Sequence, residues 1–184
     1  MEDVYSYLYT DSQDEVKPLK LFEGKVLLVF NFALHSSFLS SYVSNIEIAY
    51  RAMADLGFEV LSFPSSSFLK QNDEDTLKTI EYLKDNFQIT FKVGKRIEDD
   101  AHNALLFERL ALNKKFNGLN NINPLYETID SYWLSRDPFY KSKNTIKWVF
   151  TSFVISRDGK IKKRYECLDD VHNIIKDIRK ELDR

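Results

Sequence analysis

The apolar positions of the chain form continuous runs in some segments and helical spacings in others. The run at 25–32 is apolar at almost every position, which predicts a strand buried on both faces of a sheet. Apolar residues then recur at helical spacing from Leu39 to Met53, with Gly57 placed to end the helix. A second strand-like run follows at 58–63. Strand, helix and strand in this order predict a right-handed βαβ unit with two parallel strands.

The C-terminal part of the chain has the pattern of a hairpin followed by a helix. Two strand-like runs at 146–155 and 160–165 flank the turn 157–159, which reads Arg-Asp-Gly. Asp-Gly between two such runs is a strong signal for a tight hairpin. Apolar residues then share one face of residues 171–182, which predicts a final helix.

The middle of the chain adds further helices and a segment without clear periodicity. Helical spacing marks residues 77–87 and 101–112, whereas residues 113–145 have weak periodicity and are interpreted as a long insertion. A parallel βαβ unit and an antiparallel ββα unit around one sheet make the thioredoxin-like arrangement. The sequence therefore predicts a single α/β domain over residues 1–184, with a central mixed β-sheet flanked by helices and the insertion placed before the C-terminal ββα unit.

Composition and charge narrow the class of protein. The chain has 184 residues, a formal net charge of −2 and one cysteine, Cys167. A charge so close to neutral argues against a nucleic-acid partner, and a single cysteine excludes an internal disulfide and a cysteine-rich zinc site. No apolar run approaches the ~18 residues of a membrane span, and the acidic N-terminus lacks the pattern of a secretory signal. We therefore expect a cytoplasmic protein without a metal or a cofactor.

Five blocks of sequence carry a family resemblance. In chain order they are FEGKVLLVFNFA (22–33), LGFEVLSFPSSSF (56–68), FQITFKV (87–93), DDAHNALLFERL (99–110) and IKWVFTSFVISRDGKIKKRY (146–165). Together they resemble the glutathione peroxidase family, in the same order and at matching spacings over most of the chain. The resemblance implies a thioredoxin-like fold and a site that reduces hydroperoxides at the expense of a thiol.

The resemblance places the family's active-site residues on positions where this chain differs. The peroxidatic selenocysteine or cysteine aligns with Ser36, the glutamine with Ser67 and the asparagine with Val149, while the tryptophan is kept as Trp148. A resolving cysteine, present in some members, aligns with Leu83. A serine hydroxyl cannot pass through the sulfenic or selenenic state that peroxide reduction requires. We therefore expect a degenerate site and assign none of its residues as catalytic.

Several of these positions have an alternative interpretation. Ser36 with His35 as its base would make a hydrolase nucleophile, but the sequence supplies no third orienting group, and capping of the following helix is the simpler role. The serine run 65–67 is either a phosphorylatable or anion-binding loop before a helix or a solvated turn. Trp148 either keeps a role in the site or fills volume beside it. Cys167 lies outside the family's pocket, as a relocated redox thiol or a structural residue.

The insertion is rich in aromatic residues. Those singled out as a possible interface are Tyr126, Tyr132, Trp133, Phe139 and Tyr140. Aromatic side chains anchor protein interfaces, and they also pack long loops onto a domain, so both interpretations stay open. We expect residues 113–145 to carry the main contact surface, either to a partner protein or to a second copy of the chain.

Three hypotheses for function follow, of which the weakest is a different enzyme that uses Cys167 or the serines. The first is a glutathione-peroxidase-like protein that has lost peroxidase activity and acts as a protein-binding or structural subunit. The alternative is a glutathione- or thioredoxin-dependent hydroperoxide reductase of the oxidative stress response, in which Ser36 replaces a native cysteine. The simultaneous absence of the family's glutamine and asparagine weighs against the alternative, because a single replacement would leave both in place.

Overall fold

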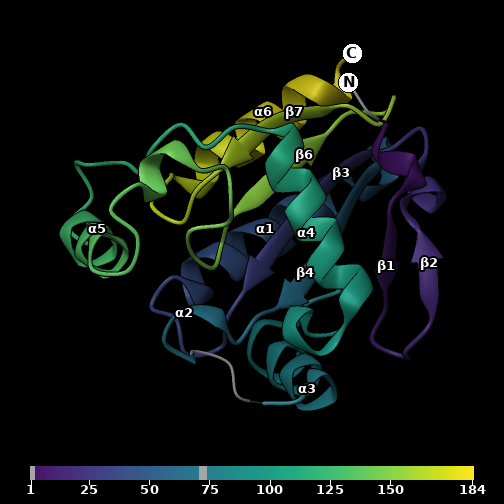
Figure 1. The fold of residues 1–184 in the computed structure, drawn as a ribbon. Helices are drawn as coiled ribbons and strands as arrows, with labels where there is room; N and C mark the ends of the chain where they lie inside the picture. The colour runs from purple at the N-terminus through teal and green to yellow at the C-terminus, as the bar shows by residue number, and fades with distance from the viewer. Residues whose placement is uncertain (1–2, 71–73) are drawn as a thin grey trace.

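Within the residues that the structure describes, 3–70 and 74–184, a five-stranded mixed sheet forms the centre of the molecule, in the order β5-β4-β3-β6-β7 (Figure 1). The structure is a computed structural model. The strands are β3 (Val26–Phe32), β4 (Phe58–Pro64), β5 (Lys92–Val93), β6 (Ser152–Ile155) and β7 (Ile161–Tyr165). β3 pairs with β4 in parallel and with β6 in antiparallel, which confirms the predicted mixed sheet with its first strand at the centre.

The residue pattern of β3 explains its central place. All seven of its residues are buried. Alternate side chains enter two different apolar cores: Leu28 and Phe30 face one, and Leu27 and Val29 face the other. A strand covered on both faces needs apolar residues at nearly every position, and this is the pattern from which the strand was predicted.

Helices cover both faces of the sheet (Figure 1). One core contains residues of α1 (Leu39–Met53), α3 (Thr76–Phe87) and α6 (Val171–Leu182), and the opposite core contains residues of α4 (Ala101–Asn113). The short helix α2 (Ser67–Lys70) follows β4. This layering is the thioredoxin-like arrangement predicted from the βαβ and ββα units.

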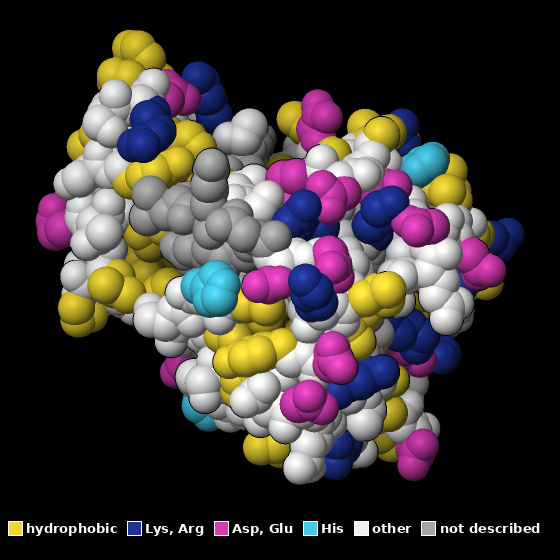
Figure 2. Space-filling model, turned by 90° about the horizontal axis from the view of Figure 1, so that it is seen from below, with side chains coloured by type: hydrophobic (Ala, Val, Ile, Leu, Met, Phe, Trp, Pro, Cys, Tyr) yellow, Lys and Arg dark blue, Asp and Glu magenta, His cyan; other side chains and the backbone are white. Residues whose placement is uncertain are grey.

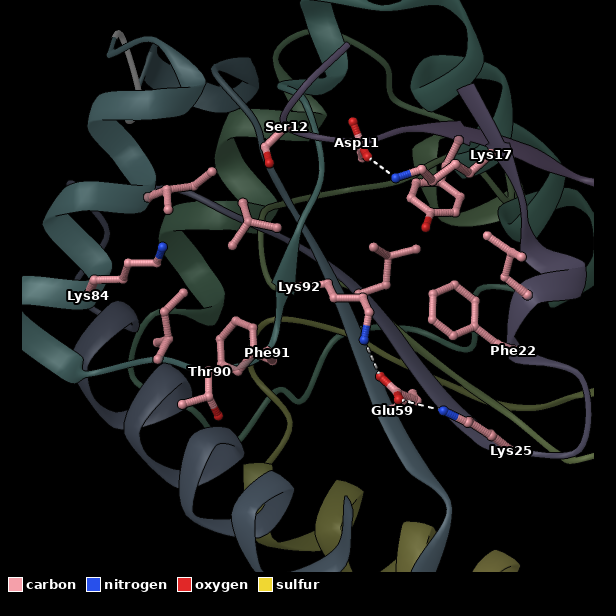
Figure 3. Close-up of a pocket in the computed structure, with 16 residues that line it drawn as sticks. Asp11, Ser12, Lys17, Phe22, Lys25, Glu59, Lys84, Thr90, Phe91 and Lys92 are labelled. Carbon is pink, nitrogen blue, oxygen red and sulfur yellow. Dashed lines mark hydrogen bonds and ion pairs between the residues drawn. The ribbon is translucent and has the colours of Figure 1, made fainter. Parts of the chain in front are cut away.

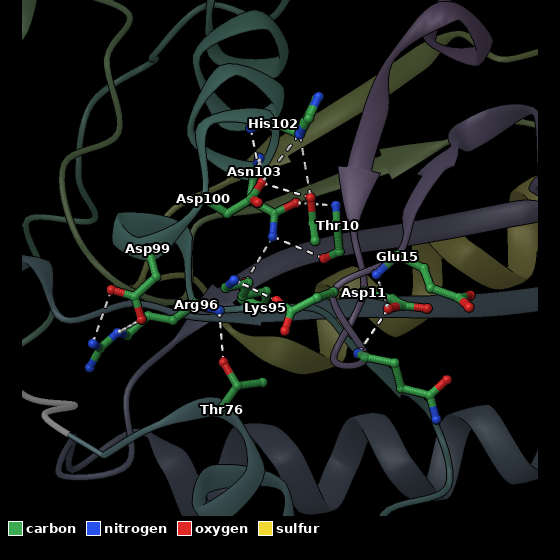
Figure 4. Close-up of polar contacts among 12 residues, drawn as sticks. Thr10, Asp11, Glu15, Thr76, Lys95, Arg96, Asp99, Asp100, His102 and Asn103 are labelled. Atoms are coloured by element: carbon green, nitrogen blue, oxygen red, sulfur yellow. Dashed lines mark hydrogen bonds and ion pairs between the residues drawn. The ribbon is translucent and has the colours of Figure 1, made fainter.

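An N-terminal hairpin, not predicted from the sequence, consists of β1 (Leu8–Thr10) and β2 (Val16–Pro18). Its anchor is Asn103 of α4, a fully buried residue. The Asn103 side chain accepts a hydrogen bond from the Thr10 amide at 2.8 Å and donates to the carbonyls of Thr10 and Lys95 at 3.0 and 2.9 Å (Figure 4). These bonds fix the hairpin to α4 and to the segment after β5.

The predicted insertion, residues 113–145, forms a lobe at one side of the molecule and contains α5 (Tyr126–Leu134) (Figure 1, left). Arg164 of β7 holds both ends of this lobe. Its guanidinium, which is almost fully buried, donates to the carbonyl of Lys114 at 3.3 Å and to that of Thr145 at 3.1 Å. Because a guanidinium presents several donors in a fixed plane, one side chain ties both ends of the lobe to the sheet.

The strand predicted over 146–155 is shorter in the structure, where it consists of β6 alone. Phe150 has φ +62°, a left-handed conformation that an extended strand cannot contain. The Asn31 side chain of β3 holds this turn: it accepts from the Thr151 amide at 2.9 Å and donates to the Trp148 carbonyl at 3.3 Å. The residues before β6 therefore form a fixed turn beside β3.

The face seen in Figure 2 carries both hydrophobic and charged side chains. Hydrophobic side chains lie over the lobe at the left and also in the middle of the main body, where Lys or Arg and Asp or Glu side chains alternate around them. Among the helices of the described residues, we find none with the length and apolar character that crossing a bilayer requires. In the same part of the chain, no three His, Cys, Asp or Glu side chains are grouped to hold a metal ion.

Candidate functional site

The predicted site residues meet at the carboxyl ends of the parallel strands β3 and β4. Ser36 follows the end of β3, and Ser67 begins α2 just after β4. The Ser65 amide donates to the last carbonyl of β3 at 2.8 Å, which ties the two strand ends together. Trp148 and Val149 reach the same region from the turn before β6, which pairs with β3 on its other side.

Ser36 lies in the turn that leads into α1. Its hydroxyl accepts a hydrogen bond from the Phe38 amide at 3.2 Å, and its carbonyl accepts one from the Leu39 amide at 3.2 Å. Phe38 is the N-cap residue of α1. Ser36 therefore stabilises the turn before the helix and is not the cap that the sequence suggested. Its neighbour His35 is exposed.

The side chain of Ser67 contacts an anion that the chain itself supplies, the carboxylate of Glu98. This carboxylate accepts hydrogen bonds from the hydroxyls of Ser65 and Ser67 at 2.6 and 2.5 Å, and from the amides of Ser66 and Ser67 at 2.9 and 3.1 Å. Partial burial would raise the pKa of Glu98, but these hydrogen bonds outweigh it and lower that pKa below its usual value. The serine run thus binds a carboxylate of the chain itself, that of Glu98.

Trp148 is covered by two aromatic side chains. It is 4 % exposed. Phe68 stacks on its ring with the centroids 5.3 Å apart, and Tyr132 of the insertion lobe meets it edge-on at 5.1 Å. Val149 beside it is fully buried. Aromatic pairs at these distances contribute packing energy beyond their buried area. The surroundings of Trp148 are therefore those of a packing residue, and the lobe is part of its cover.

Lys147, which sequence reasoning did not single out, is a fully buried lysine at the base of the lobe. Its ammonium donates to the Thr145 hydroxyl at 2.8 Å. Three aromatic rings surround it, with centroids 5.1, 5.5 and 6.0 Å away: those of Phe116, Trp133 and Tyr140. Burial, helped by the positive charge of Arg164, lowers the pKa of Lys147 to about 8. The rings offset part of the cost of burying its charge.

The aromatic residues predicted as an interface face mostly inward. Tyr140 is buried, and Tyr126, Tyr132 and Trp133 are partly buried against the core. The indole nitrogen of Trp133 donates to a backbone carbonyl of the turn before β6 at 2.7 Å. Phe139, in contrast, is 73 % exposed. Four of the five thus serve to hold the lobe on the domain, and Phe139 is left on the surface.

Other apolar side chains are exposed on the same lobe. Ile122, at 89 %, and Phe139 are the two most exposed large hydrophobic residues in the described part of the chain. Leu125 and Leu134 are exposed as well. Phe139 was predicted from its aromatic ring. Ile122, Leu125 and Leu134 are aliphatic, so the aromatic content of the lobe did not indicate them.

Cys167 and Leu83, the two remaining predicted positions, are both buried. Cys167, after β7, is 6 % exposed, and burial together with the charges of Glu166 and Asp169 raises the pKa of its thiol. Because the thiolate is the reactive form, this thiol is poorly suited to redox chemistry. Leu83, at the position of a resolving cysteine, is fully buried in α3.

Comparison with known proteins gives a consistent set of matches. The family model described as glutathione peroxidase matches residues 4–110. "Probable glutathione peroxidase 5" of Arabidopsis thaliana is 28% identical over 181 residues, which cover 98% of this chain and 91% of that protein. "Hydroperoxy fatty acid reductase gpx1" of Synechocystis sp. is 30% identical over 165 residues, which cover 89% of this chain and 86% of that protein.

Solved structures share the fold at lower sequence identity. The crystal structure of Trgpx in apo form matches with a TM-score of 0.64 and 22% identity, over 100% of this chain and 98% of that chain. A thiol:disulfide interchange protein of the thioredoxin family from Chlorobium tepidum matches with a TM-score of 0.62 and 14% identity, over 98% of this chain and 95% of that one. Both likenesses concern the fold, and they agree with the predicted thioredoxin-like arrangement.

Proposed function

The chain belongs to the glutathione peroxidase family, and from this premise we propose that it has lost peroxidase activity and acts as a protein-binding subunit. Two relatives carry the names "Probable glutathione peroxidase 5" and "Hydroperoxy fatty acid reductase gpx1". This chain keeps their fold and changes the residues on which that chemistry depends.

The observation that carries the proposal is the absence of an available sulfur. Ser36 stands where the resemblance places the peroxidatic residue, and Cys167 is the chain's one cysteine. Peroxide reduction oxidises a thiolate or selenolate and then regenerates it with a thiol, a cycle that a serine hydroxyl cannot perform. The Cys167 thiol is buried and its pKa is raised, so it does not supply the missing thiolate.

The contacts around the positions of the family's active site support a loss of peroxidase activity and not an adjustment of it. Glu98 takes the hydrogen bonds of Ser67, and Phe68 and Tyr132 cover Trp148. Val149 offers no polar group to a developing charge. A peroxide would have to displace packed aromatic side chains to reach Trp148, and it would find a carboxylate already bound to the serine loop.

The binding role rests on the surface of the insertion lobe. Ile122, Leu125, Leu134 and Phe139 present apolar side chains to solvent on a lobe that Arg164 and the rings around Lys147 hold in place. Hydrophobic side chains are visible over this lobe at the left of Figure 2. Exposed apolar patches on a fixed element mark protein interaction sites. The proposed partner is therefore a protein with a complementary apolar surface, either another chain or a second copy.

Two measurements test the proposal. The first is peroxidase turnover of the purified chain, for which we expect none; turnover would favour the alternative reductase. The second is size-exclusion chromatography with light scattering, combined with affinity capture from native extract. We expect a stoichiometric complex that the double change Ile122→Ser and Phe139→Ser abolishes. Leu112→Ser, at an exposed position on α4, is the matched control. Equal association by both variants would refute the lobe as the contact surface.

A further inference from the structure

A groove on the opposite side of the sheet from β6 and β7 is unconnected with the site described above. It has a volume of about 530 Å³ and lies at the sheet edge formed by β5 (Figure 3). Its walls come from the N-terminal hairpin, the segment 19–22 and α3. None of the residues that align with the family's active site lines it. Its volume lies within the range typical of small-molecule sites.

The floor of the groove is apolar. It is made by side chains from separate elements of the fold: Phe22, Leu61, Ile80, Ile89 and Phe91. Leu21 adds an apolar side chain at the rim, where it is 60 % exposed. A ligand that lies in this groove would therefore bury an apolar body, and that burial is favourable by about 25 cal/mol per Å².

The rim of the groove is positively charged. Four lysines and two carboxylates line it: Lys17, Lys25, Lys84, Lys92, Asp11 and Glu59. Glu59 pairs with Lys25 and with Lys92, at 2.7 Å in each case, so one carboxylate compensates two ammonium groups. Lys17 pairs with Asp11 and, at 2.9 Å, with Glu15, which lies outside the lining. The four lysines thus exceed the three carboxylates paired with them by one positive charge, in a chain whose net charge is −2.

Lys84 supplies the least compensated charge of this rim. In Figure 3 it reaches from α3 toward the groove, on the side opposite Phe22 and Lys25. Within the described part of the chain it has no ion-pair partner, in contrast to the other three lysines. An anion placed beside Lys84 would meet an ammonium group without first breaking an ion pair.

From this combination of charge and shape we propose that the groove binds an amphipathic monoanion, an organic carboxylate with an extended apolar body. The carboxylate contacts Lys84 at the rim, and the apolar body lies on the floor between Phe91 and Phe22. The uncompensated charge shared by Lys25 and Lys92 adds long-range attraction for the anion as it approaches the groove. This site is independent of the proposed binding role of the insertion lobe, so either can stand without the other.

Isothermal titration with sodium decanoate, at concentrations where the probe is monomeric, tests the proposal. We expect saturable one-to-one binding of decanoate, much weaker binding of butyrate, and no binding of decyltrimethylammonium. Lys84→Gln should weaken decanoate binding about two- to fivefold, the range for one exposed charge pair, and Leu21→Ser should weaken it about fivefold through lost apolar contact.

Matched controls separate the groove from general effects. Lys78→Gln changes a lysine on the same helix that does not line the groove, and Leu112→Ser changes an equally exposed leucine elsewhere. Both should leave decanoate binding unchanged, and thermal unfolding of every variant verifies its fold. Absence of saturable decanoate binding, equal binding of the cationic probe, or equal effects of control and groove variants would overturn the proposal. Butyrate binding as tight as decanoate binding would also overturn it.

Discussion

Phe68 stacks on Trp148, with the two ring centroids 5.3 Å apart and the ring planes 27° apart. The two residues lie in the segments that the resemblance associates with the family's active site: Phe68 follows Ser67, and Trp148 precedes Val149. In this chain the two segments meet through aromatic packing. Tyr132 of the insertion lobe completes the cover.

Removing Tyr132 should uncover Trp148. Tyr132→Ala deletes a ring that meets Trp148 edge-on at 5.1 Å, and we expect it to destabilise the fold by about 1–3 kcal/mol. Acrylamide quenching of tryptophan fluorescence, measured in a Trp133→Phe background because the chain has a second tryptophan, should increase at the same time. Tyr82→Ala, at an exposed position on α3, is the control. Unchanged quenching in Tyr132→Ala would show that the lobe does not protect Trp148.

Removing the charge of Glu98 should weaken the serine loop in a pH-dependent way. The folded-state pKa of Glu98 is lowered, so its contribution to stability is present above the unfolded pKa of about 4.5 and is lost as pH falls through the lower folded value. We expect Glu98→Gln to cost about 1 kcal/mol near pH 7, since the group is partly exposed. Chemical unfolding at pH 7 and pH 3 should show that this difference shrinks in acid. Glu108→Gln, on the exposed face of α4, should show no such change.

Lys147 should make the free energy of unfolding depend on pH between about 8 and 10.5. Its folded-state pKa of about 8 lies below its unfolded value of 10.5, so the folded state binds fewer protons between these values. The free energy of unfolding of the wild type, measured relative to Lys147→Met, should therefore rise as pH increases from 8 to 10.5. Below pH 8 we expect the variant to be as stable as the wild type or more stable, because it buries no charge.

Unfolding by urea at pH 7, 8.5 and 10 measures this difference. Lys162→Met, on β7, is the control and should show a constant difference from the wild type across the series. A difference between wild type and Lys147→Met that stays flat from pH 7 to 10 would mean that Lys147 keeps its charge within the ring of aromatic side chains.

Restoring the nucleophile alone should restore little activity. Ser36→Cys returns a thiol to the turn before α1, but Ser67 stays bound to Glu98 and Val149 stays apolar. We expect feeble turnover from the single variant and more from the combination with Ser67→Gln and Val149→Asn, by more than the sum of the separate effects, because such groups act as a unit. Since an asparagine at 149 is buried, thermal unfolding must accompany the rates. Equal rates for the single and triple variants would contradict this account of the site.

The sheet could be predicted because its signals are local. The run at β3 is apolar at nearly every position, and Asp158-Gly159 marks the hairpin between β6 and β7. The N-terminal hairpin could not be found in this way, because each of its strands has three residues and Asn103, 93 positions from Thr10, holds it in place. A short strand anchored by a distant side chain leaves no periodic pattern in the sequence.

In the candidate site, too, the positions could be predicted from the sequence and their long-range contacts could not. Alignment of the family's residues located Ser36, Ser67, Trp148 and Val149, which do gather at one edge of the sheet. The contacts that give these positions their character come from elsewhere in the chain. Glu98 reaches Ser67 across 31 positions, and Tyr132 reaches Trp148 from the insertion lobe. Long-range pairs of this kind depend on the folded arrangement and are not visible in spacing or composition.

The central claim, loss of peroxidase chemistry, is tested most directly by a coupled assay on the wild-type chain. Consumption of NADPH is followed with glutathione and glutathione reductase, or with thioredoxin and thioredoxin reductase, against hydrogen peroxide and an organic hydroperoxide. We predict a rate equal to that of a Cys167→Ser variant and to the rate without protein. Turnover above these backgrounds would contradict the account: if Cys167→Ser abolished it, the thiol of Cys167 would be the active sulfur, and if the turnover persisted, the reduction would proceed through a group other than a cysteine.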